Sequence, residues 1–169
     1  MSIHVFVDES VRRDYLLCAV TVEARHVRMC RKTMLSLRQP GQRRIHFVNE
    51  RPDRRKCLLD QIVGLPVKAQ FFCASGKHVP ARRSCLQETM VALADQPVRR
   101  FVLEAGDAED RRDRQTATAM AAKVPWLGTV YLEHLRPFEE PLLWIPDALA
   151  WAHTAGGEWR QRIAEITSG

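Results

Sequence analysis

A chain of 169 residues, 46% of them hydrophobic, is long enough to bury one sizeable core, which predicts a single domain over residues 1–169. No window approaches the ~18 uninterrupted apolar residues of a membrane span, and the first apolar run is too short for a secretory signal, so we expect a soluble, cytoplasmic protein. The five cysteines are scattered without a close pair, which argues against a disulfide framework or a zinc knuckle.

The net charge of +6 is unevenly distributed along the chain. Residues 1–100 carry 19 Lys and Arg against 9 Asp and Glu, whereas residues 101–169 carry 7 against 11. A basic half facing an acidic half is compatible with a polyanion-binding surface beside a metal-binding site. An arginine-rich composition of the whole genome would give the same asymmetry, so the charge alone does not decide between the two.

The first predicted elements form a hairpin followed by a helix. IHVFV (3–7) and YLLCAVTV (15–22) are apolar runs typical of buried strands, and the polar stretch DESVRRD connects them. Residues 24–37 place apolar side chains at steps of three and four, which predicts a helix that stops at RQPGQ. The residues on its apolar face are Val27, Cys30, Met34 and Leu37.

Extended segments and helices then alternate. RIHFV (44–48) is predicted to be a short extended segment. The last helix of the chain is expected to begin near Pro146, because a backbone N–H is not needed as a hydrogen-bond donor in the first turn of a helix. Between them we expect helices at 50–63, 80–95 and 107–123, and strands at 67–74, 99–105 and 128–135. This order predicts an α/β domain with a mixed sheet.

Two acidic residues follow apolar strands. Asp8 is expected to end the first strand, and Glu104 the strand RFVLE. The carboxyl ends of neighbouring parallel strands open into a common crevice, where two carboxylates ~4.8 Å apart could share a hard cation such as Mg²⁺. Asp147 is a third candidate, because it lies between the apolar runs LLWIP and ALAWA.

Each acid also has a structural interpretation. Asp8 could be a turn residue and Glu9 a solvated flank, while Asp147 could interact with the dipole of its helix. Glu104 is one of several acids in this stretch that could be the site residue. The others could instead cap the next helix: Asp107, Glu109 and Asp110.

Basic and aromatic residues supply secondary candidates. His46 in RIHF could bind a phosphate, assist a water or ligate a metal, or it could be a satisfied, partly buried histidine. Five arginines could hold phosphates or form a solvated helix face: Arg43, Arg44, Arg51, Arg54 and Arg55. The four tryptophans are interpreted as core and interface residues, not as base-stacking platforms.

Taken together, VFVDES at the N-terminus, HF after the first helix, an acid at the end of a mid-chain strand and PLLWIPDALAWA near the C-terminus resemble the DUF3800 family, an uncharacterised group with a ribonuclease H-like fold. The resemblance extends from residue 5 to about residue 153 and rests on the order and spacing of short motifs. It implies a ribonuclease H-like mixed sheet with helices on both faces. It also implies one or two Mg²⁺ or Mn²⁺ ions held by Asp8, Glu104 and Asp147, with Glu9 and His46 as further candidates.

These residues favour a divalent-metal-dependent nuclease, or a related phosphoryl-transfer enzyme, acting on RNA or DNA. In two-metal nucleases the carboxylates are ligands, while one ion activates a water and the other stabilises the leaving oxygen ~4 Å away. A non-catalytic module that binds nucleic acid or protein on the same fold is the alternative. A small-molecule enzyme or toxin-like component is a third possibility, for which the sequence shows no pocket signature.

Overall fold

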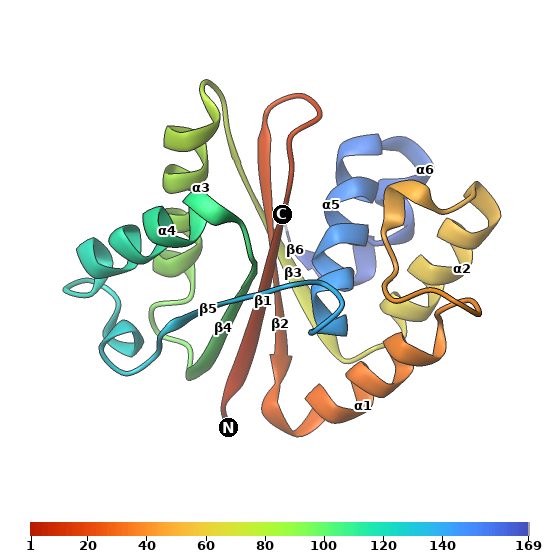
Figure 1. Cartoon of the computed structure of the whole chain (residues 1–169), viewed down its shortest axis with the longest axis horizontal. Helices are drawn as coiled ribbons and strands as arrows, with labels where there is room; N and C mark the ends of the chain where they lie inside the picture. The colour runs from red at the N-terminus through yellow and green to blue at the C-terminus, as the bar shows by residue number, and fades with distance from the viewer. Residues whose placement is uncertain (169) are drawn as a thin grey trace.

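The computed structural model describes residues 1–168, which form an α/β fold around a six-stranded mixed sheet (Figure 1). The strand order is β5-β4-β1-β2-β3-β6. β1 pairs antiparallel with β2 and parallel with β4, and β4 pairs parallel with β5. The strands are β1 (Ile3–Ser10), β2 (Tyr15–Glu23), β3 (Val67–Ala74), β4 (Val98–Glu104), β5 (Leu132–Leu135) and β6 (Thr167–Ser168).

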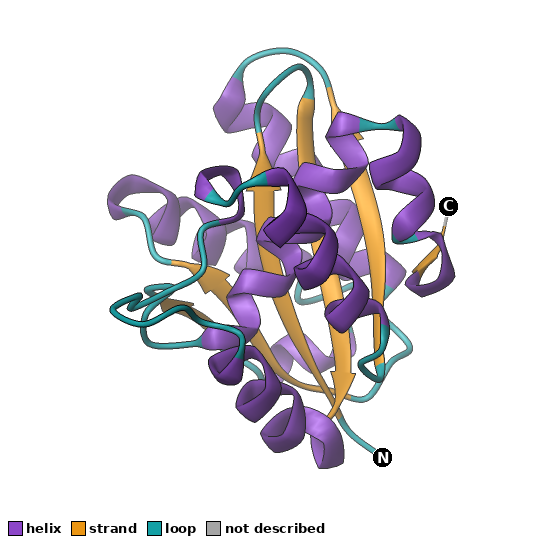
Figure 2. Cartoon of the chain, turned by 90° about the vertical axis from the view of Figure 1, so that its right-hand side faces the viewer, coloured by secondary structure: helices purple, strands orange, loops and turns teal. Residues whose placement is uncertain are grey.

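Helices cover both faces of this sheet, as the resemblance implied. Helices α3 and α4 pack on one face, and α1, α2 and α5 lie on the other (Figure 1). Figure 2 shows this second layer in front of the strands. The helices are α1 (Ala24–Ser36), α2 (Pro52–Val63), α3 (His78–Ala92), α4 (Asp107–Met120), α5 (Trp144–Ala155) and α6 (Gly157–Arg162). Among residues 1–168, no helix is long and apolar enough to cross a bilayer.

The central strand β1 contributes to a hydrophobic core on each face of the sheet. Successive side chains of a strand point to opposite faces. Phe6 packs with the buried residues of α1, α2 and α5, whereas Val5 and Val7 pack with those of α3 and α4. The same alternation directs the next two residues, Asp8 and Glu9, to different faces.

The parallel pairing of β1 with β4 brings two of the predicted acids to neighbouring strands. Phe6 pairs with Val102 and Val7 with Leu103, so Asp8 and Glu104 each lie one residue further along. The expectation that these two strands are neighbours is therefore confirmed.

The first strand is longer than its apolar run suggested. It continues through Ser10, and Asp8 pairs with Cys18 inside the β1–β2 ladder. Asp8 thus lies within the strand near its carboxyl end, and the prediction that Asp8 ends the strand is wrong. Backbone pairing does not require apolar side chains, so a partner strand can extend β1 past the buried stretch.

Other differences concern short segments. The segment predicted as extended at 44–48 instead leads into a 3₁₀ helix, η1 (Phe47–Asn49). The predicted strand at 128–135 is reduced to β5, preceded by the 3₁₀ helix η2 (Pro125–Gly128). The last long helix begins at Trp144 rather than Pro146, directly after η3 (Pro141–Leu143). Short apolar runs do not distinguish strands from helical turns, because both bury such residues.

Candidate functional site

Asp8 projects from β1 on the face covered by α5, which packs against β1 and β2. Its Oδ1 accepts a hydrogen bond from the backbone N–H of Glu9 at 2.8 Å. Burial raises the pKa of Asp8 well above the ordinary carboxyl value, and the negative charges of Asp147 and Glu104 raise it further. The three predicted acids therefore lie within electrostatic range of one another.

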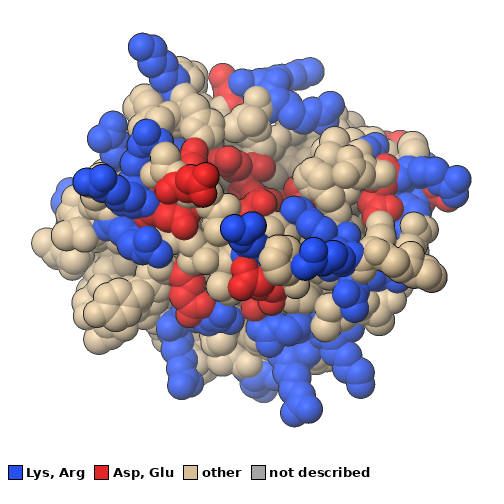
Figure 3. All heavy atoms as spheres, viewed as in Figure 1, with Lys and Arg blue, Asp and Glu red and all other residues tan. Residues whose placement is uncertain are grey.

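Asp8 and Glu104 line the same hollow at the carboxyl ends of β1 and β4. The hollow has a volume of about 280 Å³, and its charged lining consists of Asp8, Glu9, Glu104, Glu109 and Arg82. Acidic side chains gather near the centre of the face shown in Figure 3, surrounded by Lys and Arg. The hollow carries more negative than positive groups, which favours a cationic ligand.

Asp147 lies in the first turn of α5 and ties this helix to η1. Its Oδ2 accepts the backbone N–H of Phe47 at 3.0 Å, and His46 Nδ1 lies 3.5 Å from the same oxygen. The side chain of Asp147 is 16% exposed, whereas that of His46 is 44% exposed. Asp147 thus has a structural role in holding the His46 segment, and it keeps a second oxygen that no described hydrogen bond uses.

Arg44 lies between two of the predicted ligands. Its Nη1 is 3.8 Å from Glu104 Oε1, and its Nη2 is 3.9 Å from Asp147 Oδ2. The Nη2 atom is also 3.3 Å from His46 Nδ1. Sequence reasoning placed Arg44 among phosphate-binding residues, but here its guanidinium balances the charge of the two carboxylates.

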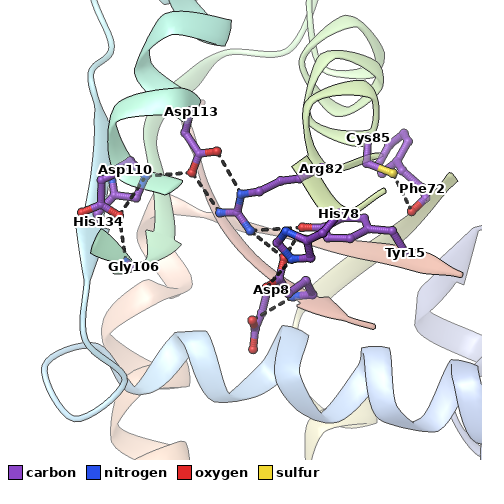
Figure 4. A network of polar contacts seen from close by, with 11 residues as sticks. Asp8, Tyr15, Phe72, His78, Arg82, Cys85, Gly106, Asp110, Asp113 and His134 are labelled. Carbon is purple, nitrogen blue, oxygen red and sulfur yellow. Dashed lines mark hydrogen bonds and ion pairs between the residues drawn. The ribbon is translucent and has the colours of Figure 1, made fainter. Parts of the chain in front are cut away.

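Glu9 belongs to a different polar network, on the face of the sheet covered by α3 and α4. Its carboxylate accepts a hydrogen bond from Arg82 Nη1 at 2.7 Å and another from the hydroxyl of Tyr15. The Nε and Nη2 atoms of Arg82 both donate to Asp113 at 2.9 Å, and His134 Nε2 lies 2.9 Å from Asp113 (Figure 4). Glu9 therefore shares the hollow with Asp8, but its charge is already compensated.

The other predicted phosphate-binding arginines mostly make structural contacts around η1. Arg55 donates to the carbonyls of Phe47 and Val48 and lies over the Trp151 ring, 4.3 Å from its centroid. Arg54 donates to the carbonyl of Leu37 at 2.8 Å. The remaining two contact nearby side chains: Arg43 lies over Phe138, and Arg51 pairs with Asp53.

The donor chemistry of the carboxylate site fits a hard divalent cation. Across residues 1–168, no three His, Cys, Asp or Glu side chains are already arranged around one metal position. However, Glu104 and Asp147 contact the single guanidinium of Arg44, and Asp8, which makes no described ion pair, lies within electrostatic range of both acids. Oxygen ligands with excess negative charge are what Mg²⁺ and Mn²⁺ prefer. These are the three residues that would hold the ion.

Sequence reasoning missed Arg82, Asp113 and His134, which fix Glu9. They come from α3, α4 and β5 and meet only in the folded chain. A weak signal was present, because Asp113 falls at a buried position of the predicted helix 107–123, where an unpaired carboxylate would be costly.

Comparisons with known proteins define the fold and leave the family open. No family model matches the chain, and no curated protein matches its sequence, so the DUF3800 resemblance stays a prediction. The structure is similar to ribonuclease H2 from Pyrococcus horikoshii, with a TM-score of 0.59 and 13% identity over 88% of this chain and 70% of that one. It is also similar to ribonuclease HII from Archaeoglobus fulgidus, solved in complex with PCNA, with a TM-score of 0.56 and 14% identity over 98% and 75% of the two chains. The fold is therefore ribonuclease H-like, as the resemblance implied.

Proposed function

We propose that this protein is a divalent-metal-dependent nuclease, or a related phosphoryl-transfer enzyme, acting on RNA or DNA. One observation supports the proposal: the buried Asp8 lies within electrostatic range of Glu104 and Asp147, and of these three acids Arg44 contacts only Glu104 and Asp147. The structural relatives are named ribonucleases, which supports the choice of substrate. We further propose a cytoplasmic location and membership of the DUF3800 family.

Bound Mg²⁺ or Mn²⁺ would supply charge stabilisation at the phosphoryl group and a water of lowered pKa. Asp8, Glu104 and Asp147 are proposed to hold the ion. His46 Nδ1 lies 3.5 Å from Asp147 Oδ2 and 3.3 Å from Arg44 Nη2, and we propose that its exposed ring exchanges a proton with water or substrate. Arg44, beside Glu104 and Asp147, would hold a phosphate oxygen of the substrate.

The test is cleavage of labelled RNA, DNA and hybrid duplexes by the wild-type protein and by Asp8→Asn, with Mg²⁺ or Mn²⁺ and with a chelator. We expect the wild type to cleave only with the metal, and Asp8→Asn to be slower by at least ~10–100-fold, because even outer partners of metal ligands have effects of that size. Asp95→Asn is the matched control, since Asp95 is exposed and follows α3. Equal rates for wild type and Asp8→Asn would remove Asp8 from the mechanism.

A non-catalytic nucleic-acid-binding module on the same fold is the second candidate function. The position of Arg44 favours it, because a guanidinium between Glu104 and Asp147 stabilises the acids without a metal. This alternative expects salt-sensitive binding, no cleavage and no shift in melting temperature on addition of Mg²⁺ or Mn²⁺. A metal-dependent shift that Asp147→Asn abolishes would favour the enzyme instead.

A further inference from the structure

A second cavity lies between helices α3 and α4, beside the acidic hollow. It has a volume of about 280 Å³, near the lower end of the range of about 300–1,000 Å³ found for small-molecule sites. We call it the α3–α4 pocket. The polar residues that matter here are Arg82, Arg83, Gln87, Arg112, Gln115 and Thr116.

Two arginines of this pocket are free to bind an anion. Arg83 on α3 and Arg112 on α4 are exposed, and neither makes an ion pair or a side-chain hydrogen bond within the part of the chain that is described. Arg82 is different, because its guanidinium is already bound to Asp113 and Glu9. The pocket thus presents two unpaired guanidinium groups from facing helices against one acid of its lining, Glu109, while the buried Asp113 is compensated by Arg82 and His134.

The lining also contains groups that suit more than a bare phosphate. Gln87 and Gln115 offer amide donors and acceptors, and Val79 and Ala119 provide apolar surface. An arginine fork binds phosphate oxygens in pairs, whereas amide and apolar groups accommodate a sugar or a base. The combination fits a phosphorylated ligand of about nucleotide size.

The neighbouring cavities carry opposite charge. Arg82 and Glu109 line both of them, so they form the boundary between the α3–α4 pocket and the acidic hollow. The hollow repels an anion unless a metal ion is present, whereas Arg83 and Arg112 attract one without a metal. Binding in the pocket is therefore separable from metal binding.

We propose that the α3–α4 pocket binds the phosphoryl group of a nucleotide, either a free nucleoside monophosphate or the phosphorylated end of a strand. The choice of a nucleotide as the ligand rests on the proposed function. The proposal that the pocket binds an anion is supported independently by the two arginines and by the cavity. Arg83 and Arg112 hold the phosphoryl oxygens, and the glutamine amides face the sugar and base.

The experiment is isothermal titration calorimetry of the full chain with adenosine 5′-monophosphate, inorganic phosphate and adenosine, at low salt and in a chelator. We expect the monophosphate to bind more tightly than phosphate, and adenosine to show no binding. Arg83→Gln and Arg112→Gln should each weaken monophosphate binding about tenfold, the effect of losing one charge-assisted hydrogen bond. Arg28→Gln, an exposed arginine on α1, is the matched control and should bind as the wild type does.

A second variant tests the cavity and not its charge. Ala119→Phe keeps both arginines and fills the space at an exposed position of the lining, so it should also weaken binding. A 5′-phosphorylated oligonucleotide identifies the source of the ligand, because binding tighter than that of the monophosphate assigns the pocket to a strand end.

The outcomes separate this site from the nuclease. Asp8→Asn should retain monophosphate binding while losing cleavage. If the wild type binds the monophosphate but cleaves no substrate, the proposed pocket is supported and the proposed nuclease function is contradicted. No binding of either nucleotide ligand, or equal binding by wild type and Arg83→Gln/Arg112→Gln, overturns the proposal.

Discussion

At the level of single residues, the pair Asp8 and Glu9 shows how one step along a strand changes the role of a carboxylate. Asp8 faces the α5 side and gains no arginine, so its pKa is raised by burial and by two neighbouring acids. Glu9 points toward α3 and is held by Arg82 and Tyr15. The strand period of two explains the difference without any further assumption.

The raised pKa of Asp8 predicts that the metal-free protein is destabilised by this residue at neutral pH. The folded state binds the proton more tightly than the unfolded state, so stability falls as the pH rises from the ordinary carboxyl range toward the raised pKa. Asp8→Asn keeps the acceptor for the Glu9 N–H and removes the charge. We expect it to raise the melting temperature in a chelator, by about 2–4 °C for each kcal/mol relieved.

Thermal denaturation of both proteins across a pH series measures this effect. The difference should be small at acid pH, where Asp8 is protonated in both states, and should grow toward neutral pH. Added Mg²⁺ should reduce it by stabilising only the wild type. A variant that melts at the wild-type temperature at every pH would show that the charge of Asp8 is not held in an unfavourable environment.

At the level of elements, the network of Arg82, Asp113 and His134 joins α3, α4 and β5. Burial by itself would raise the pKa of Asp113, but its hydrogen bonds with His134 and Arg82 outweigh burial and lower the pKa. The side chains of Asp113 and Arg82 are 2% and 11% exposed. Such a pair holds the helices in one arrangement, because removing either partner leaves the other buried with only part of its compensation, His134 for Asp113 or Glu9 for Arg82.

Removing Arg82 should therefore destabilise the fold. We expect Arg82→Met to lower the free energy of unfolding by about 3–5 kcal/mol, measured by urea denaturation at neutral pH. The loss should shrink as the pH falls through the lowered pKa of Asp113, because ionised Asp113 contributes stability only above that value. Arg25→Gln, which breaks the exposed ion pair with Glu23, should cost less than about 1 kcal/mol.

A double variant separates the charge effect from packing. Arg82→Met/Asp113→Leu removes both charges and should recover part of the stability lost by Arg82→Met. If the double variant is less stable than Arg82→Met alone, packing of the guanidinium rather than compensation of Asp113 explains the loss.

The elements most accurately predicted from the sequence are those whose burial follows one clear period. The face of α1 that buries Val27, Cys30 and Met34 repeats every three to four residues, and β2 and β3 are short apolar runs with polar boundaries. In contrast, β6 has two residues and depends on pairing with β3, so its own sequence carries no strand signal. The spacing of apolar residues shows which side of an element is buried. It does not predict an element such as β6, which is defined by backbone pairing with a neighbouring strand and not by burial.

The candidate site could be predicted only as far as strand order allowed. That Asp8 and Glu104 lie on neighbouring strands was predicted from the two apolar strands that precede them, and the β1–β4 pairing confirms it. The position of Arg44 depends on the path of the chain between α1 and α2. No local pattern fixes that path, and so the guanidinium between Glu104 and Asp147 was not predicted.

At the level of the whole molecule, the sheet separates two hydrophobic cores that each depend on β1 and β2. Cys18 and Cys30 belong to the core under α5, and Cys85 to the core under α3, whereas Cys57 and Cys73 are exposed. Burial raises the pKa of Cys18 well above its ordinary value and raises that of Cys85 to about 12. Because the thiolate is the reactive form, these thiols are doubly protected in the folded state.

This distribution makes the thiols reporters of cooperativity, and it tests the prediction of a single domain. We expect Cys57 and Cys73 to react with a disulfide reagent in the native protein, and Cys18, Cys30 and Cys85 to become reactive only on unfolding. Shared central strands couple the two cores, so the three buried thiols should lose protection at the same urea concentration, as quantified by mass spectrometry of each labelled cysteine. Exposure of Cys85 at a lower urea concentration than Cys18 would mean that the α3–α4 layer unfolds separately, and the network around Arg82 would then stabilise that layer alone.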